Sequence, residues 1–160
     1  MRNSNRPSPR GRRGHTLIEL VVVLVVMALL WGIAAPRYAS AMFRYRAEAA
    51  ARRIAADLTM ARAYAMQTSS SVPVTFDTTN NKYTLTGIQS LDRLSSNCTV
   101  NLSVDPYQAT LTTVPFTSNK VTFNTYGSAD QSGTITVTSG GFAWTVTLEA
   151  TSGKVTVSGP

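Results

Sequence analysis

The sequence of 160 residues contains one cysteine, one histidine and only 14% charged residues. A single cysteine, Cys98, cannot form a disulfide within the chain, and one cysteine with one histidine cannot complete a four-ligand zinc site. The histidine, His15, lies far along the chain from Cys98, which argues against Cys-His and Ser-His-Asp catalysis. Disulfide scaffolds and zinc modules are therefore excluded, and the common nucleophilic hydrolases are not expected.

Acidic residues are also scarce, and the net charge of +7 is unevenly distributed. Residues 1–14 hold five arginines and no acid, and residues 37–62 hold six arginines and two acids. From Thr68 onward four basic residues stand against five acidic ones, so this part has a formal charge of −1. We interpret the arginines of 37–62 as a solvated helix flank beside an anionic membrane, with a nucleic-acid site as the alternative.

A long apolar run lies near the N-terminus. Residues 20–35 are apolar at every position except Gly32, and the 21 residues from 15 to 35 would make a helix of about 32 Å, enough to span a bilayer. Because basic residues and no acid precede the run, the positive-inside rule places residues 1–14 in the cytoplasm and the chain after Arg37 outside. The sequence therefore predicts a single span.

Glu19 lies inside this run, where an ionised carboxylate costs about 2.5 to 3.5 kcal/mol. One interpretation is that Glu19, about 6 Å from the start of the run, reaches the lipid headgroups. The other is a cationic partner at the same depth. Cleavage after Gly14 would supply one, because His15 of a neighbouring copy would then carry a free α-amino group.

The segment RRGHTLIEL, residues 12–20, closely resembles the class III leader of type IV pilins and type II secretion pseudopilins. The resemblance implies that a membrane aspartyl peptidase removes the leader after Gly14 and methylates the new amino terminus, His15. It implies that Glu19, the fifth residue of the mature chain, forms a salt bridge with the N-terminus of an adjacent subunit during assembly. It also implies a helix kink at Pro36. The family usually has phenylalanine where this chain has His15.

An ordinary secretory signal peptide is the competing interpretation. Its cleavage site would be the small residues 39–41, and cleavage there would release a secreted soluble β-domain. The carboxylate inside the run, the length of the run and the helical pattern that continues through the cleavage site argue against it.

The helical pattern continues after Pro36, which can kink a helix without ending it. Residues 38–66 contain no glycine or proline and are rich in Ala, Arg and Met, so they favour helix. The charged residues of this segment, including Asp57, fall mostly away from one narrow apolar stripe, and polar residues 68–71 predict the end of the helix. The stripe repeats at spacings of three or four and comprises Ala47, Ala50, Ile54, Leu58, Ala61 and Ala65.

From Val72 the apolar pattern has a period of two, which predicts strands. A hairpin is predicted over 72–88 around a turn at 77–81, and weaker strands over 98–104 and 109–116. The clearest alternation predicts a strand pair over 135–148 around Gly140 and Gly141, and a last strand follows a turn at 151–153. These strands predict a small antiparallel sheet assembly whose apolar face covers the helix stripe.

Segments of this C-terminal part resemble the GspH/FimT family of minor pseudopilins and minor pilins. The resemblance implies an α+β, type IV pilin-like lollipop: a long N-terminal helix, with a membrane half and an amphipathic half, packed on a C-terminal antiparallel β-sandwich head. The similar segments are residues 61–66, 121–127, 133–138 and 152–155. The expected parts are a cleaved basic leader at 1–14, a transmembrane or filament-core helix at 15–36, an amphipathic helix at 37–68 and a β-rich head at 69–160.

The resemblance implies a minor pseudopilin, a structural subunit without enzymatic activity in the periplasmic pseudopilus that drives protein export by the type II secretion system. The implied partners are a prepilin peptidase/methyltransferase, other pseudopilins or pilins and an inner-membrane assembly platform; no cofactor or metal is expected. The implied location is the bacterial inner membrane, with the N-terminus cytoplasmic and the head periplasmic, and then the filament. The alternative is a minor pilin of a type IV pilus that acts in assembly priming or DNA uptake.

Nucleic-acid binding is not expected of the head. DNA-uptake members of the family are expected to carry a C-terminal Gly-Arg-x-Arg, whereas residues 153–156 read Gly-Lys-Val-Thr, and phosphate neutralisation supplies most DNA affinity. Aromatic residues can stack on bases, but alternating strand positions favour the core. The aromatics considered are Tyr83, Tyr107, Tyr126, Phe142 and Trp144.

Three further features of the head have simple interpretations. Its five carboxylates lie on separate turns, which argues against a glycosidase pair. The acid and amides of 77–81 are expected to cap the turn, with a calcium site as the alternative. Cys98 is expected to pack as a small apolar residue.

Overall fold

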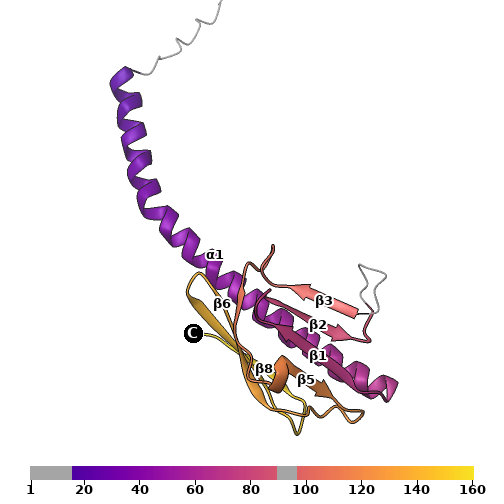
Figure 1. Ribbon diagram of the computed structural model, residues 1–160. Helices are drawn as coiled ribbons and strands as arrows, with labels where there is room; N and C mark the ends of the chain where they lie inside the picture. Colours follow the sequence, from indigo (N-terminus) through magenta and orange to yellow (C-terminus); the bar gives the residue numbers. More distant parts are fainter. Residues whose placement is uncertain (1–15, 90–96) are drawn as a thin grey trace, which may run out of the picture. The chain divides into compact units, whose positions relative to one another are not determined.

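The computed structural model describes residues 16–89 and 97–160. Within them the chain forms one long helix, eight strands and a short 3-10 turn (Figure 1). The candidate cleavage residues Gly14 and His15 lie outside the described residues. The chain divides into two compact units, of which the first ends at Tyr38 and the second runs from Ala39 to Pro160. Helix α1, Leu17–Thr68, contributes to both.

The first unit contains the apolar part of α1. Thr16 begins the helix, since its carbonyl oxygen accepts a 3.2 Å hydrogen bond from the backbone N–H of Leu20. A window of 18 residues in this helix has a mean hydropathy of 2.8, and none of it is buried, so α1 has the length and composition of a membrane span. The helix continues through Pro36.

In the second unit, α1 presents the predicted apolar stripe to the core. All six residues of the stripe are no more than 1% exposed, which confirms the prediction. Ala51, outside the predicted stripe, is also fully buried and widens it. The helix ends at Thr68, where the polar stop was expected, and its hydroxyl bonds back to the carbonyl oxygen of Tyr64 at 2.8 Å.

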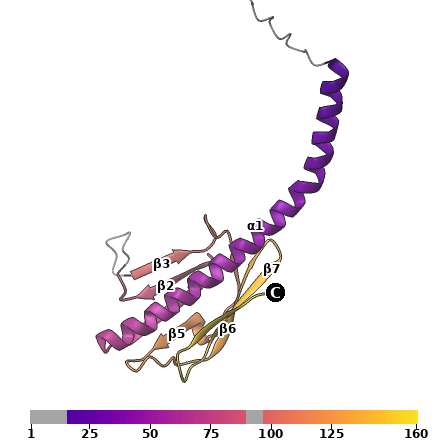
Figure 2. The ribbon, with the colours of Figure 1, turned by 180° about the vertical axis from the view of Figure 1, so that it is seen from behind.

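Two four-stranded antiparallel sheets form the rest of the second unit. Sheet A has the order β3 (Asn97–Asn101), β2 (Lys82–Thr86), β1 (Val72–Asp77) and β5 (Lys120–Phe123), with the 3-10 turn η1 (Thr117–Asn119) just before β5. Sheet B has the order β4 (Thr110–Thr113), β6 (Gly133–Ser139), β7 (Phe142–Leu148) and β8 (Val155–Ser158). Figure 2 shows the C-terminal half of α1 lying along the face of both sheets.

One hydrophobic core joins α1 to both sheets. It contains Ile54 and Leu58 of the helix together with Val74 of sheet A and Val137 of sheet B, each no more than 1% exposed. The alternating burial of β1 and β6 shows why the strands form here, since every second side chain points into this core. The α+β class, with a long helix followed by an antiparallel two-sheet head, is therefore confirmed.

The strand predictions were right for the two hairpins and for the last strand, β8, and strands β3 and β4 overlap the two segments that were predicted more weakly. Strands β1 and β2 pair around the turn of Asp77, and β6 and β7 pair around Gly140 and Gly141, as expected. Strand β5 was not predicted: it has only four residues, and its pairing with β1 connects segments about 50 residues apart. Such a strand has little local signal, because it depends on a distant partner.

Candidate functional site

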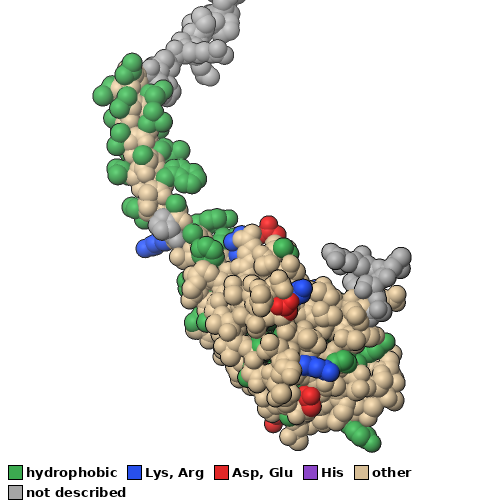
Figure 3. Space-filling view, viewed as in Figure 1, with side chains coloured by type: hydrophobic (Ala, Val, Ile, Leu, Met, Phe, Trp, Pro, Cys, Tyr) green, Lys and Arg blue, Asp and Glu red, His purple; other side chains and the backbone are tan. Residues whose placement is uncertain are grey.

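The apolar part of α1 exposes large hydrophobic side chains, which are stable only when lipid or another protein surface buries them. From Leu17 to Ile33 its large apolar side chains are between 43% and 82% exposed, and Figure 3 shows apolar side chains projecting along both edges of this helix. A shallow groove of about 160 Å³ runs between Met27, Leu30, Trp31 and Ala34 on this surface. Burial of each large apolar side chain is worth about 1.5 to 3 kcal/mol. A lipid bilayer or neighbouring apolar helices would therefore stabilise this segment strongly.

Glu19 lies in the first turn of this helix, where a carboxylate interacts favourably with the helix dipole. Its backbone N–H donates a 3.3 Å hydrogen bond to Oγ1 of Thr16, which places Thr16 as the N-terminal cap. The side chain of Glu19 is exposed on the apolar part of the chain. The structure thus places an acidic group within the first turn of α1, at the start of its apolar part.

A buried polar cluster joins the amphipathic part of α1 to sheet A. Asp57 is only 6% exposed, and its Oδ2 accepts hydrogen bonds from Arg53 Nε at 2.9 Å and from the Tyr83 hydroxyl at 2.5 Å. The side-chain hydrogen bond to Asp57 raises the pKa of Arg53, and burial raises the pKa of Tyr83 well above its usual 10. Expecting Asp57 on the wet side of the helix was therefore wrong, because Tyr83 and Arg53 satisfy its carboxylate inside the protein.

Arg62 lies in a narrow slot between two glycine turns. Gly127 and Gly153 have φ angles of +81° and +61°, which L side chains rarely adopt. A Cβ added to Gly127 would lie 2.7 Å from Met66 Sδ and 3.2 Å from Arg62 Nε. One added to Gly153 would overlap the Gly127 carbonyl oxygen and lie 3.0 Å from Arg62 Cδ. Three of the family-like segments, at 61–66, 121–127 and 152–155, therefore converge on one arginine.

The turn beside this slot carries an exposed aromatic. Asn124 Oδ1 accepts hydrogen bonds from the backbone N–H groups of Tyr126 and Ser128, both at 3.0 Å, which fixes the turn. The Tyr126 side chain is 86% exposed. The expectation that the aromatics belong to the core holds for Tyr83, and Tyr107 and Trp144 pack partly buried against the core. It is wrong for Tyr126, because a turn residue has no sheet face to bury it.

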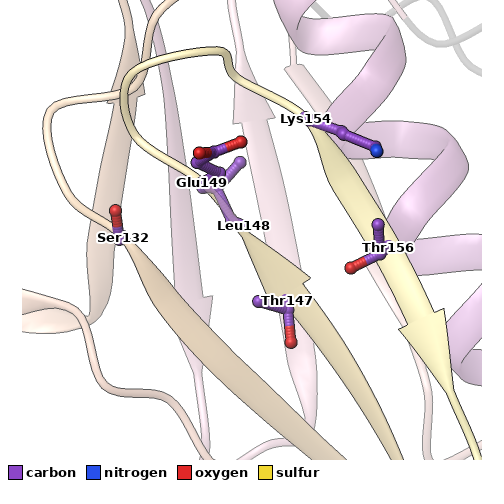
Figure 4. Close-up of a pocket in the computed structure, with 6 residues that line it drawn as sticks. All are labelled: Ser132, Thr147, Leu148, Glu149, Lys154 and Thr156. Atoms are coloured by element: carbon purple, nitrogen blue, oxygen red, sulfur yellow. The ribbon is translucent and has the colours of Figure 1, made fainter.

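The hollow on the outer side of sheet B does not have the charge of a nucleic-acid site. It has a volume of about 400 Å³ and includes one basic and one acidic side chain, Lys154 and Glu149 (Figure 4). Glu149 Oε2 accepts a 2.6 Å hydrogen bond from Ser152 Oγ. One cation opposite one carboxylate gives little phosphate attraction. The hollow is lined by Ser132, Thr147, Leu148, Glu149, Lys154 and Thr156.

Asp77 caps its turn, in agreement with the simpler of the two expectations. Its carboxylate accepts hydrogen bonds from Asn80 N at 3.0 Å and from Asn80 Nδ2 at 2.7 Å, and Lys82 Nζ lies 3.4 Å away. The hydrogen bonds from the Asn80 side chain and backbone lower the pKa of Asp77. Cys98, the other residue with a simple expected role, is buried in the core. Within residues 16–89 and 97–160, no group of three His, Cys, Asp or Glu could hold a metal ion.

Comparison with known proteins matches both halves of the chain to family models. The model described as Type II transport protein GspH matches residues 50–153, more than half of the chain. The model described as Prokaryotic N-terminal methylation motif matches residues 9–35. Searches among curated proteins and among solved structures gave no match. The first match begins within the amphipathic part of α1 and ends before β8, so it covers sheet A and three of the four strands of sheet B, and the second covers part of the basic N-terminus and the apolar part of the helix.

Proposed function

We propose a mechanism from one premise: the chain belongs to the Type II transport protein GspH family. Together with the N-terminal methylation motif, this membership makes it a minor pseudopilin of type II secretion, a structural subunit. The motif also makes the chain a substrate of a prepilin peptidase, and the apolar helix is that of a single-span inner-membrane protein. The type IV pilus alternative is not better supported.

The observation that carries the mechanism is the exposed apolar half of α1 ahead of a compact head. A helix of this kind is stable in a bilayer and equally stable in a bundle of similar helices. We therefore propose that the subunit is stored in the inner membrane and then moves into the pseudopilus, where neighbouring helices replace the lipid. The head, whose core is already buried between its two sheets and α1, remains on the periplasmic side throughout.

The proposed topology follows from the charges at the two ends of the span. Residues 1–14 carry five arginines and no acid, so they remain in the cytoplasm, and the head is translocated. We propose that the peptidase cuts between Gly14 and His15 and methylates the amino group of His15. The parts of the mature chain would then be the filament-core helix at 15–36, the amphipathic helix at 37–68 and the head at 69–160, with Pro36 as the kink between the two helix parts.

Glu19 would direct assembly. A carboxylate is costly in hydrocarbon, and pairing with the methylated amino terminus of a neighbouring subunit would lower that cost inside the filament. The pair can form only at one axial offset between two helices, so it also sets the register of the growing filament. The partners proposed on this basis are other pseudopilins and the inner-membrane platform that adds them. The subunit itself would contribute force transmission and contacts, with no reaction of its own.

The test is the mass of the N-terminal peptide of the protein isolated from its native membranes. A chain that starts at His15 and carries one additional methyl group is the expected result. A chain that starts at Ala41 or beyond, in a protein recovered in soluble form outside the cell, would overturn the mechanism and leave an ordinary secreted domain. Deletion of the gene for this chain distinguishes type II secretion from a type IV pilus. We expect the deletion to abolish protein export by type II secretion and to leave pilus function normal.

A further inference from the structure

Arg62 is a cation without a partner on the part of the chain that the structure describes. Its Nε is buried and has no hydrogen-bond acceptor, and no ion pair involves its guanidinium. The described carboxylates of the head bond elsewhere, and so does Asp57 of the helix, which accepts from Arg53 and Tyr83. The head carboxylates and their donors are Asp77 with Asn80, Asp105 with Gln108, Asp130 with Thr122 and Glu149 with Ser152. A buried donor that is left unsatisfied costs about tenfold or more in the equilibrium that buries it. An acceptor from outside cannot reach the enclosed Nε, but the side chain as a whole is half-buried, so the terminal nitrogens of its guanidinium are the donors that such an acceptor would meet.

The slot around Arg62 holds the side chain in one place. Gly127 and Gly153 provide backbone walls at positive φ angles, where a Cβ at Gly153 would overlap the Gly127 carbonyl oxygen and a Cβ at Gly127 would press on the side chain of Met66. An arginine held in this way loses little further freedom when it binds, because its stem is already packed. Its planar guanidinium also suits a carboxylate, to which it can donate two parallel hydrogen bonds.

The surroundings of the slot have the composition of a binding surface. Tyr126, adjacent to Gly127, is 86% exposed, and Met66 is 42% exposed. Tyrosine, methionine and arginine are the residue types that are enriched at protein interfaces, and tyrosine and arginine dominate their energetic centres. Nucleic acid fits less well, since the described part of the head is not a basic surface and its phosphate-binding potential is small. We call Arg62, Met66 and Tyr126 the arginine patch.

We propose that the arginine patch binds a carboxylate, flanked by apolar side chains, on the head of a different pseudopilin in the same filament. This inference rests on the proposed function, because only an assembled subunit has such a neighbour. The guanidinium of Arg62 receives the carboxylate, and Tyr126 and Met66 cover the pair and exclude water from it. The contact adds a second specific site at the head to the one at Glu19, and it selects which companion lies beside this subunit.

The experiment places a photo-crosslinking benzoylphenylalanine at Tyr126 in the full chain, in its native host with each companion pseudopilin tagged. A second variant carries the crosslinker at Leu24, on the apolar helix, and reports assembly independently of the head. We expect Tyr126 to crosslink to one companion, and Arg62→Met to reduce that product about tenfold while the Leu24 product persists. Arg52→Met is the matched control, because Arg52 is an exposed arginine of the same helix that pairs with Glu48 at 2.7 Å.

A charge-reversal experiment, in which a change in the companion restores the crosslink, completes the test. Arg62→Glu is expected to abolish the Tyr126 product, and an acid-to-arginine change at the crosslinked position of the companion is expected to restore it. Methionine keeps an apolar stem in the slot, so Arg62→Met preserves folding, which resistance to protease in native membranes checks.

Three outcomes would overturn the proposal while the proposed function stands, as long as the Leu24 product forms. These are a Tyr126 product that Arg62→Met leaves unchanged, a product with secreted cargo or with a second copy of this chain, and the absence of any Tyr126 product. If the Leu24 product is also absent, the proposed function itself fails.

Discussion

The hydroxyl of Tyr83 on β2 donates a 2.5 Å hydrogen bond to Oδ2 of Asp57 on α1, across 26 residues of sequence. Asp57 is 6% exposed and Tyr83 is 1% exposed, so this contact lies inside the head. It ties the amphipathic helix to sheet A at one point, where apolar packing alone would allow the helix to slide. In the assembly that we propose, such a fixed point would carry force between the helix and the head.

Tyr83→Phe is expected to destabilise the head by about 1.5 to 3 kcal/mol, because it removes a hydrogen bond to a buried charged group and leaves the carboxylate with Arg53 alone. Urea unfolding of the full chain in detergent, followed by far-ultraviolet circular dichroism of the strands, measures the difference. Tyr126→Phe is the control, since that hydroxyl is exposed, and no change is expected there. Equal stability of Tyr83→Phe and the unaltered chain would contradict a role for this hydrogen bond.

Asp77 gives the head an acid-dependent stability. Its pKa is lowered in the folded chain, first by the Asn80 hydrogen bonds, so ionised Asp77 stabilises the fold at neutral pH. That contribution to stability is fully present when the pH is above the ordinary aspartate pKa. It is lost as the pH falls through the lowered pKa of Asp77 in the folded chain. The stability difference between the unaltered chain and Asp77→Asn should therefore shrink on acidification, which urea titrations from pH 7 to pH 2 would measure. A difference that stays constant over this range would exclude the mechanism.

Much of the fold could be predicted because its signals are local. The stripe from Ala47 to Ala65 repeats with the period of a helix, and the hairpin strands alternate with the period of a sheet. The burial of Asp57 could not be predicted from such local patterns. Its burial depends on Tyr83, a partner on a strand 26 positions away, and a carboxylate on a helix is otherwise solvated.

The arginine patch also could not be predicted from local sequence patterns. The segments that meet there were recognised as family-like, yet nothing in their spacing indicates that Gly127 and Gly153 enclose Arg62. That enclosure arises from the pairing of strands within each sheet and from the end of α1. The signal that could have located it is the pair of glycines in turns, since glycine is required where φ is positive and another backbone approaches closely. Tyr126 was misplaced because it follows Asn124, whose side chain builds a turn and ends the strand alternation.

The substitution Glu19→Gln is expected to impair assembly without impairing membrane insertion. The neutral amide lowers the cost of the span in lipid, so insertion and leader processing are expected to be unchanged or improved. Co-assembly is expected to fall by about a hundredfold, because the amino terminus of the neighbour then lacks a charged partner in an apolar bundle. Crosslinking between the apolar helices of neighbouring subunits in native membranes measures this co-assembly. Glu48→Gln is the matched control, since Glu48 pairs with the exposed Arg52 and such pairs are worth at most about 1 kcal/mol. Unaltered co-assembly of Glu19→Gln would refute the salt bridge.

Gly153→Ala tests whether the slot around Arg62 is as tightly packed as its geometry requires. The new Cβ would overlap the Gly127 carbonyl oxygen and press on Arg62 Cδ at 3.0 Å, and alanine is also strained at a φ of +61°. Gly141→Ala is a close control, since Gly141 has a φ of +88° and no atom within 4 Å of the added Cβ. Backbone strain alone costs about 1 to 2 kcal/mol and affects both variants, whereas overpacking adds about 1 to 3 kcal/mol to Gly153→Ala alone. Urea unfolding of the two full-length variants separates these contributions. Equal losses of stability would mean that the Gly127 turn moves aside freely, and a slot that yields in this way could not hold Arg62 in place for a partner.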